Sequence, residues 1–468
     1  MRQKTLKRLA TIAAVSAALI LTFSHRSIQA EQRNSVAHPT KSYQLAFYNR
    51  HRYSYRVAGA LHFAHSKLHD VLLLTPFKDH AKEDSKLYEQ ILKFYNKPPK
   101  VEPSMELYAP YTAQATWRLF QTIDSVHLLH EMTEDIMSDA DIPWHEKEAK
   151  LKEAYEYYRK TYKDIVLSPA PLDVTMRRAA VMMKPYFSLT RNYYPKNNNF
   201  FYAAHWWHPG VYESMMIGGN DAEQDQMMTQ MEEVFKSEVI PSPPQRMLLS
   251  REGSPRYSRL SPETANVFDN LHMLHGITYD IFAYDGWTIE QKRAELYRVL
   301  DAMSYKPGDE KLVRKFTTPR PNYNPLNYDR WTKNSDGAMT TMMLEMLDEM
   351  MPIMMANHGK MNHQDMNPDM NHDNMNMNQV HQQLKQQLKL KLTPGIQEGE
   401  IPGSFMDAMR KIMPNMSPHG GMEAGKINPQ MVEAMLQGWQ DKYGNLPDIE
   451  PISMKNEPSA REILSQTP

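Results

Sequence analysis

The sequence predicts a mainly α-helical protein. Its core is an internally duplicated helical bundle with His-x-x-His pairs facing the interior, followed by a largely disordered C-terminal region rich in Met and His. The first observation is helical periodicity over most of residues 45–162 and 201–303. The second is the number of His-x-x-His pairs, because random placement of the histidines would give about one. Four occur among 19 histidines: His62/His65, His127/His130, His205/His208 and His272/His275.

The third observation is an internal repeat. The interval along the chain from His62 to His205 is nearly equal to the interval from His127 to His272. Aligning IDSVHLLHEMTEDIM with FDNLHMLHGITYDIF matches both histidines, two aspartates and a threonine. Such self-similarity indicates a duplicated supersecondary unit. We therefore predict a first helical repeat at 31–165 and a second at 201–305, related by a pseudo-two-fold axis.

The N-terminus has the pattern of a secretory signal. Four basic residues in positions 2–8 precede an apolar run from Leu9 to Phe23, which is short for a bilayer span. A small residue, Ala30, then offers a cleavage site. We expect residues 1–30 to be a signal peptide cleaved after about Ala30. The rest would be exported, most simply to the periplasm, with no membrane contact after cleavage.

The first repeat is predicted to contain four helices. The first carries a His pair and ends near Thr75-Pro76, because the residue before proline disfavours helical geometry. The third carries the second pair, and the fourth is charged with an apolar stripe. These helices are expected at residues 56–74, 84–95, 111–139 and 144–162.

The second repeat follows a predicted connector at residues 166–200. Several prolines and an Asn run at 197–199 disfavour helix there. The pair His205/His208 is then expected to open a helix. Further helices are predicted at residues 221–239, 262–283 and 287–303.

The composition changes after the second repeat. Residues 306–338 are rich in Pro and Tyr and predict an extended strap. Residues 339–381 form a Met/His-rich tract, which begins with a helical Met stripe that suits docking on a core better than metal binding. The rest of the tract lacks core-forming residues other than Met, so we expect it to be disordered without a ligand. Residues 382–468 carry two short helical patterns.

The His pairs favour a metal or cofactor site. Residues three apart on a helix share one face, and bundle cores hold metals with ligands from facing helices. One isolated pair would be better explained as core histidines, but four pairs in duplicated register favour ligation. The first repeat adds three candidate ligands, His69, Glu131 and Glu134, where the second has Tyr212, Gly276 and Tyr279. The eight paired histidines complete the candidate set.

Two aspartates precede paired histidines by one turn. Asp124 lies three residues before His127, and Asp269 lies three before His272. Metal-binding histidines commonly donate their other ring N–H to a carboxylate. We therefore expect Asp124 and Asp269 to accept such hydrogen bonds and to orient the imidazoles.

The residue types restrict the metal. The chain has no cysteine, which excludes disulfides, thiolate sites and c-type haem attachment. Imidazole-rich sites suit copper, with iron or zinc as alternatives, and haem b held by two histidines is sterically feasible. The pairs differ from the His-x-x-x-His spacing of type-3 copper proteins and from the Glu-x-x-His of di-iron carboxylate proteins. A formal net charge of −1 gives no basis for nucleic-acid binding.

The Met/His-rich tract offers soft donors, since thioether sulfur favours Cu(I) and Ag(I). The tract, about 339–381, resembles Met/His-rich segments of periplasmic copper- and silver-resistance proteins. The resemblance implies that the tract captures copper or silver ions. Its candidate ligands are Met361, His363, Met366, Met370, His372, Met375 and Met377.

Three functions are compatible with these patterns. The main hypothesis is an exported protein that binds and handles copper through a multi-His helical core and the Met/His-rich tract. The alternative is a dinuclear copper or iron oxidoreductase with its site in the bundle, so the sequence leaves enzyme activity open. In the third, a structural or interaction protein, the histidines bind no metal. Metal ions are the only partners that the sequence indicates.

Overall fold

A computed structural model describes residues 45–314, except 101–103, 185, 188, 219 and 245, together with single positions between 324 and 349. The predicted mainly α-helical fold is confirmed for these residues. Besides helices they contain one isolated β-bridge, between Leu167 and Ser304. Within the described part of the chain, no helix is both long enough and apolar enough for a membrane span. The predicted signal peptide and the tail beyond residue 349 lie outside this part.

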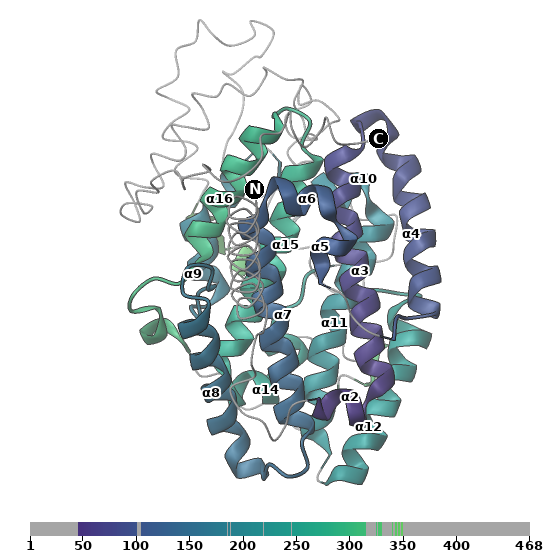
Figure 1. Ribbon diagram of the computed structural model, residues 1–468, viewed down its shortest axis with the longest axis vertical. Coiled ribbons are helices and arrows are strands. Elements are labelled where there is room, and N and C mark those ends of the chain that lie inside the picture. The colour runs from purple at the N-terminus through teal and green to yellow at the C-terminus, as the bar shows by residue number, and fades with distance from the viewer. Residues whose placement is uncertain are drawn as a thin grey trace, which may run out of the picture. The chain divides into compact units, whose positions relative to one another are not determined.

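The helices form two consecutive groups joined by α9 (Leu172–Ala179) (Figure 1). The first group comprises α2 (Ala46–Arg50), α3 (Arg52–Leu74), α4 (His80–Asn96), α5 (Met105–Tyr108), α6 (Pro110–Ala115), α7 (Trp117–Ser138) and α8 (Trp144–Thr161). The second comprises α10 (Leu189–Tyr193), α11 (Pro195–Ile217), α12 (Asp221–Val234), α13 (Ser250–Gly253), α14 (Pro255–Leu260), α15 (Pro262–Ala283) and α16 (Ile289–Met303). A π-helical turn, Phe235–Val239, extends α12.

The second group repeats the order and spacing of the first. Helix α11 has the same length as α3, and α15 has the same length as α7. The interval along the chain from α7 to α15 is also the interval from α5 to α13 and from α6 to α14. The interval from α3 to α11 is only slightly shorter. An internal duplication stays a prediction, and these matching lengths and intervals are what it requires.

Equivalent aspartates fasten the start of each group to its central helix. Asp135 on α7 accepts hydrogen bonds from the backbone N–H of Leu45 and of Phe47, both at 2.9 Å. Asp280 on α15 accepts one from the backbone N–H of Thr190 at 2.8 Å. Each carboxylate satisfies backbone donors at the beginning of a short helix, where intrahelical partners are lacking.

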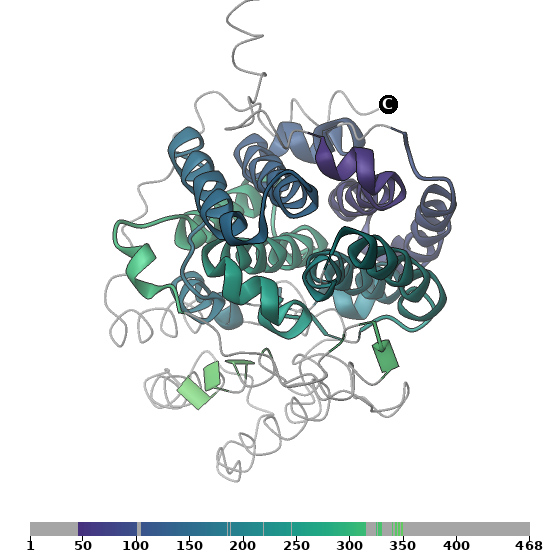
Figure 2. The ribbon, with the colours of Figure 1, turned by 90° about the horizontal axis from the view of Figure 1, so that it is seen from below.

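The four pair-bearing helices form the centre of the structure. Each of α3 and α7 packs against both α11 and α15. Helices α3 and α15 run towards the upper end in Figure 1, whereas α7 and α11 run the other way. Viewed from below, the long helices are seen end-on (Figure 2). Almost every residue of α15 is buried, which makes it the most enclosed helix of the four.

The second repeat begins earlier than the sequence predicts. The predicted connector, residues 166–200, contains α9, α10 and the first turns of α11. His205 and His208 therefore lie in the middle of α11 and do not open it. The Asn run suggests a helix boundary because asparagine disfavours helix interiors, and Pro209, which does so more strongly, also lies inside α11. The apolar surroundings of this helix, with Trp206 and Trp207 both about 1% exposed, outweigh these local preferences.

The Met stripe at the start of the Met/His-rich tract packs on the helical body, as its pattern indicates. Met339, Met342, Met343 and Met346 are each less than 9% exposed. Glu349 pairs with Arg177 of α9 through two contacts of 3.0 Å. The tract therefore begins in contact with the body, and the predicted tail ligands from Met361 onward lie outside the described residues.

Candidate metal centre

The four His-x-x-His pairs converge inside the bundle. Each pair sits one turn apart on the inner face of α3, α7, α11 or α15, and all but His127 are at most 8% exposed. Close ring contacts connect the helices: His62 lies 3.8 Å from His127, measured between ring centroids, and His205 lies 3.9 Å from His272. The eight imidazoles predicted as candidate ligands thus form one continuous cluster.

The most compact part of the cluster joins His130, His208 and His272. One ring nitrogen from each lies within 4.8 Å of those of the other two, and all three side chains are buried. The His130 centroid lies 4.4 Å from that of His208 and 6.0 Å from that of His272. Three imidazoles from three helices are a donor set that binds zinc, copper or iron. This group, called site 1, can hold a metal ion.

A buried carboxyl group adjoins site 1. The Oε1 atom of Glu134, one turn after His130 on α7, lies 3.9 Å from Nε2 of His208 and has no hydrogen-bond partner. Burial, helped by the nearby carboxylates of Glu131 and Asp135, raises the pKa of Glu134 well above its ordinary value. Burial therefore favours the protonated form of this carboxyl group, and a bound cation would favour release of the proton.

Two aromatic residues fix the His130 ring. Its Nδ1 lies 2.5 Å from the hydroxyl oxygen of Tyr212, and the Phe268 ring stacks on it at 3.5 Å. When Nδ1 donates its proton to Tyr212, Nε2 carries the lone pair, and this atom has no hydrogen-bond partner. In this tautomer the hydrogen bond to Tyr212 holds the ring and leaves Nε2 available for a metal. The alignment places Tyr212 opposite His69, but nothing in the sequence indicates its contact with His130.

Burial keeps the imidazoles neutral. It lowers the pKa of His65 to about 4 and those of His69 and His208 to about 3. Burial also lowers the pKa of each of the other paired histidines well below the ordinary value. Neutral imidazole is the form that binds metals, so the cluster needs no proton loss from histidine at pH 7.

The remaining first-repeat candidates occupy different places. His69 belongs to the cluster, with its ring 5.5 Å from His275 and 4.7 Å from Tyr279. Glu131 is half-buried, and burial raises its pKa to about 7. Its charge acts on Tyr55 and on Glu134. Of the three added candidates, His69 and Glu134 therefore join the cluster.

The two aspartates expected to orient the histidines have other partners. Asp269 accepts hydrogen bonds from the backbone N–H and the hydroxyl of Ser250, at 2.7 and 2.8 Å. Asp124 shares a hydrogen bond with the carboxyl group of Glu106. Each partner lies on a short neighbouring helix, Ser250 on α13 and Glu106 on α5. These hydrogen bonds take the place of the expected ones to histidine.

Other groups orient two of the histidines. Tyr212 does so for His130, and the backbone carbonyl of Phe201 accepts a hydrogen bond from Nδ1 of His205 at 2.6 Å. A hydrogen bond to one ring nitrogen fixes the tautomer and leaves the other nitrogen for a metal. A phenol and a main-chain carbonyl thus take the role that the sequence assigns to carboxylates.

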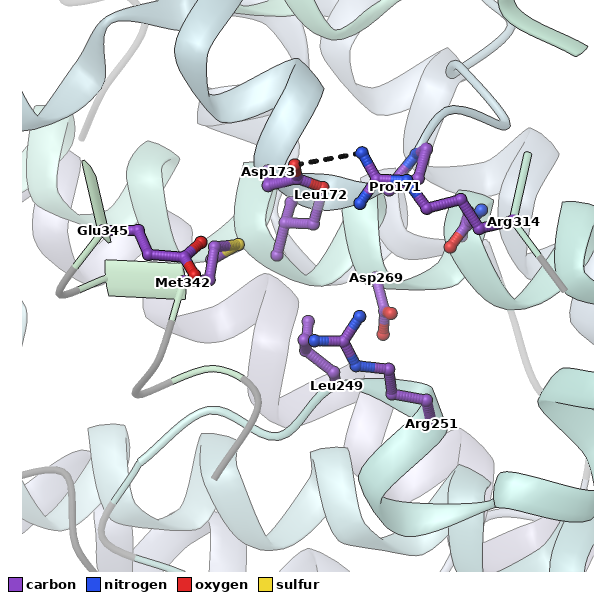
Figure 3. A pocket seen from close by; sticks show the side chains of 10 residues that line it. Pro171, Leu172, Asp173, Leu249, Arg251, Asp269, Arg314, Met342 and Glu345 are labelled. Atoms are coloured by element: carbon purple, nitrogen blue, oxygen red, sulfur yellow. Dashed lines mark hydrogen bonds and ion pairs between the residues drawn. The ribbon is translucent and has the colours of Figure 1, made fainter. Parts of the chain in front are cut away.

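A separate cavity of about 230 Å³ lies beside α15 (Figure 3). Asp269 and Arg251 border it from one side, and Met342 with Glu345 from the other. Its charged groups are of both signs, and none of the clustered histidines lines it. The cavity is therefore not part of the metal centre.

The fold and the cluster together define a helical bundle with a buried multi-histidine centre. Comparison of the chain with family models, curated proteins and solved structures found no match.

Proposed function

We propose that this protein is an exported copper-binding protein whose helical core holds the metal through histidine. The observation that carries the proposal is the convergence of His130, His208 and His272 from three helices. Support also comes from ring nitrogens that are buried without hydrogen-bond partners, including Nε2 of His130 and of His275. Such atoms are costly unless something binds them, and a metal ion is a partner that suits neutral imidazole.

Copper is the metal favoured by the two donor sets taken together. The core is rich in imidazole, and the tail carries thioethers and further imidazoles in a chain without cysteine. Copper accepts both ligand types, whereas zinc and iron(II) bind thioethers poorly. We propose that the tail captures Cu(I) or Ag(I) in the periplasm and that the core binds copper more tightly. Haem b is a weaker candidate because the ring contacts of 3.8–4.4 Å leave no room for a porphyrin between those imidazoles.

The test is copper retention by the full chain. Protein loaded with copper and dialysed should retain the metal by elemental analysis. Replacing His130, His208 and His272 with Gln should remove the copper that these three residues hold. The surface variant His145→Gln, whose side chain is 80% exposed, should leave copper content unchanged. A second variant, in which the seven candidate ligands of the tail are replaced, distinguishes copper bound by the tail from copper bound by the helical core.

Retention of no copper by the unmodified chain would overturn the proposal. If copper is lost only when the tail donors are replaced, the proposed copper binding would apply to the tail alone. With the tail donors replaced, copper content that is the same with and without the three histidines would favour a structural protein whose histidines only pack.

A second candidate function is a dinuclear metal oxidoreductase. The observation that favours it is the carboxyl group of Glu134 beside His208, together with Tyr212 on the neighbouring imidazole. A carboxyl group and a phenol next to a redox metal can transfer protons during reduction of O2. Oxygen consumption by the chemically reduced copper or iron protein, diminished in Glu134→Gln, would support this function. Absence of oxygen uptake with either metal would exclude it.

A further inference from the structure

The histidine cluster contains a second group that mirrors site 1. By position in the two groups of helices, α3 corresponds to α11 and α7 to α15. His130 of site 1 then corresponds to His275, His208 to His65, and His272 to His127. We propose that these three residues and His69 form a second metal site, called site 2. This inference rests on the proposed function, since it assigns a second ion to the same core.

The ring separations of the two groups follow the same order, with one shorter and one longer distance in each. His275 lies 5.3 Å from His65 and 6.2 Å from His127. The matching distances from His130 in site 1 are 4.4 and 6.0 Å. The contacts that link the groups have similar distances, 3.8 Å for His62–His127 and 3.9 Å for His205–His272, although the first pair of rings is stacked and the second is perpendicular. The two groups therefore share a pattern of ring distances, while the orientations of their rings differ.

Ring distances also decide which imidazoles can share an ion. With metal–nitrogen bonds of about 2.0 Å, each ring centroid lies about 3.2 Å from the ion, so two ligands at a tetrahedral angle are about 5 Å apart. The His65–His275 distance of 5.3 Å meets this condition. The His62–His127 rings, stacked at 3.8 Å, are too close to be neighbouring ligands of one ion. The imidazoles of the cluster thus divide between its two ends.

Site 2 has buried nitrogens available for a ligand. Both ring nitrogens of His69 and Nε2 of His65 and of His275 are buried without hydrogen-bond partners. The His69 ring is fully buried and packs against Phe120, Phe282 and Tyr279. An imidazole enclosed by aromatic rings with neither nitrogen satisfied carries a penalty that metal ligation would remove.

The residues around the two sites differ in one important way. Where site 1 has Tyr212, site 2 has His69, and where site 1 has Glu134, site 2 has Tyr279. Site 1 therefore combines three imidazoles with a carboxyl group, and site 2 is composed of imidazoles alone. Carboxylate favours the harder, more highly charged ion and imidazole the softer one. We expect Cu(II) to be held more tightly in site 1 and Cu(I) in site 2.

The experiment counts copper ions in the chain with its seven tail donors replaced, using copper as the probe. The unmodified core should retain two ions per chain after dialysis. His65→Gln combined with His275→Gln should retain one, and so should His208→Gln combined with His272→Gln. Electron paramagnetic resonance of the oxidised protein should show different Cu(II) spectra in the two variants, because only site 1 has a carboxyl ligand.

A milder variant covers the case in which the double variants fail to fold. His69→Gln touches site 2 alone and should weaken binding of one of the two ions about tenfold or more. A core that binds one ion, unaffected by His69→Gln or by the site 2 double variant, would overturn the second site and leave the proposed function intact. A core that binds no ion would overturn both.

Discussion

At the scale of single residues, Tyr212 is the side chain that prepares site 1. Removing its hydroxyl in Tyr212→Phe leaves Nδ1 of His130 without the partner that lies 2.5 Å away. We expect copper binding at site 1 to weaken about 10- to 100-fold, because groups that orient metal-bound histidines have effects of this size. Competition with a chelator of known affinity measures the change.

The matched control is Tyr186→Phe. Tyr186 is fully buried as well, but its hydroxyl donates to Glu295, at 2.7 Å, away from the histidines. This variant should lower the stability of the protein and leave copper affinity unchanged. Equal losses of affinity in both variants would mean that Tyr212 acts through general stability rather than through His130.

Asp124 gives a prediction about pH. Burial, followed by its hydrogen bond with Glu106, raises the pKa of Asp124 to about 8. The folded state then binds a proton that the unfolded state releases near pH 4. The free energy of unfolding consequently falls as pH rises from 4 towards 8, by up to about 1.4 kcal/mol per pH unit.

Asp124→Asn removes this titration while keeping the size and hydrogen-bonding capacity of the side chain. Urea unfolding of the metal-free protein at several pH values between 5 and 8 should show a smaller fall in the variant. Parallel curves for the two proteins would contradict the raised pKa. The sequence places Asp124 one turn before His127, but its pairing with Glu106 depends on how α5 crosses α7, which spacing along the chain does not reveal.

At the scale of helices, equivalent lysines close the ends of α7 and α15. Lys147 donates to the carbonyl oxygens of Ile136, Met137 and Asp139 at 2.6–3.0 Å, and Lys292 donates to that of Phe282 at 2.7 Å. Terminal carbonyls of a helix lack intrahelical donors, and a cation there also complements the helix dipole.

Lys147→Met should therefore destabilise the protein by about 2–4 kcal/mol, because it leaves three carbonyls unsatisfied. Lys292→Met should cost less, since one contact is lost. Denaturant unfolding measures both values. Lys152→Met on the same helix as Lys147 is the exposed control and should change stability little. A larger loss for Lys292→Met would refute this account of the helix ends.

Helix boundaries show what local sequence can and cannot predict. Helix α15 begins at Pro262 and ends at Ala283 as expected, because proline at the first position and the apolar periodicity agree. The sequence places the start of α11 too late, because the prolines of residues 166–200 and the Asn run at 197–199 disfavour helix. The helix continues through Pro209 because a neighbouring helix packs closely on it. Helix α13 has a glycine, Gly253, at the contact, and a side-chain Cβ at that position would lie only 2.5 Å from Cβ of Pro209. Tertiary packing of this kind leaves no periodic signal.

At the scale of the whole molecule, the sequence predicts which histidines converge but not how they divide. Spacing and repetition identify four helices with inward-facing pairs. The direction of each helix decides which histidine of its pair contacts which histidine of a neighbouring pair. Helix α3 lies parallel to α15 but antiparallel to α11 (Figure 1). His130 consequently meets His208 and not His205, an outcome set by the packing of the four helices. The division into two sites follows from that packing.

The cluster also predicts how metal affects global stability. In the metal-free protein, ring nitrogens of His69, His130, His205 and His275 are buried without partners, and each such group costs about 1–3 kcal/mol. Each copper ion that binds only the folded state at 1,000 times its dissociation constant would add about 4 kcal/mol. For a unit of this size that corresponds to a rise in Tm of about 8–16 °C.

Calorimetric scans of the chain with its tail donors replaced, with copper and with chelator, measure this rise. The variant with His130, His208 and His272 replaced by Gln should lose about half of it if site 2 binds independently, because each ion contributes its own binding free energy. It should lose nearly all of it if the two ions bind as a coupled pair, since His62 and His205 each contact a histidine of both sites. A rise that is the same in the variant and in the parent would show that copper stabilises the protein from outside the cluster.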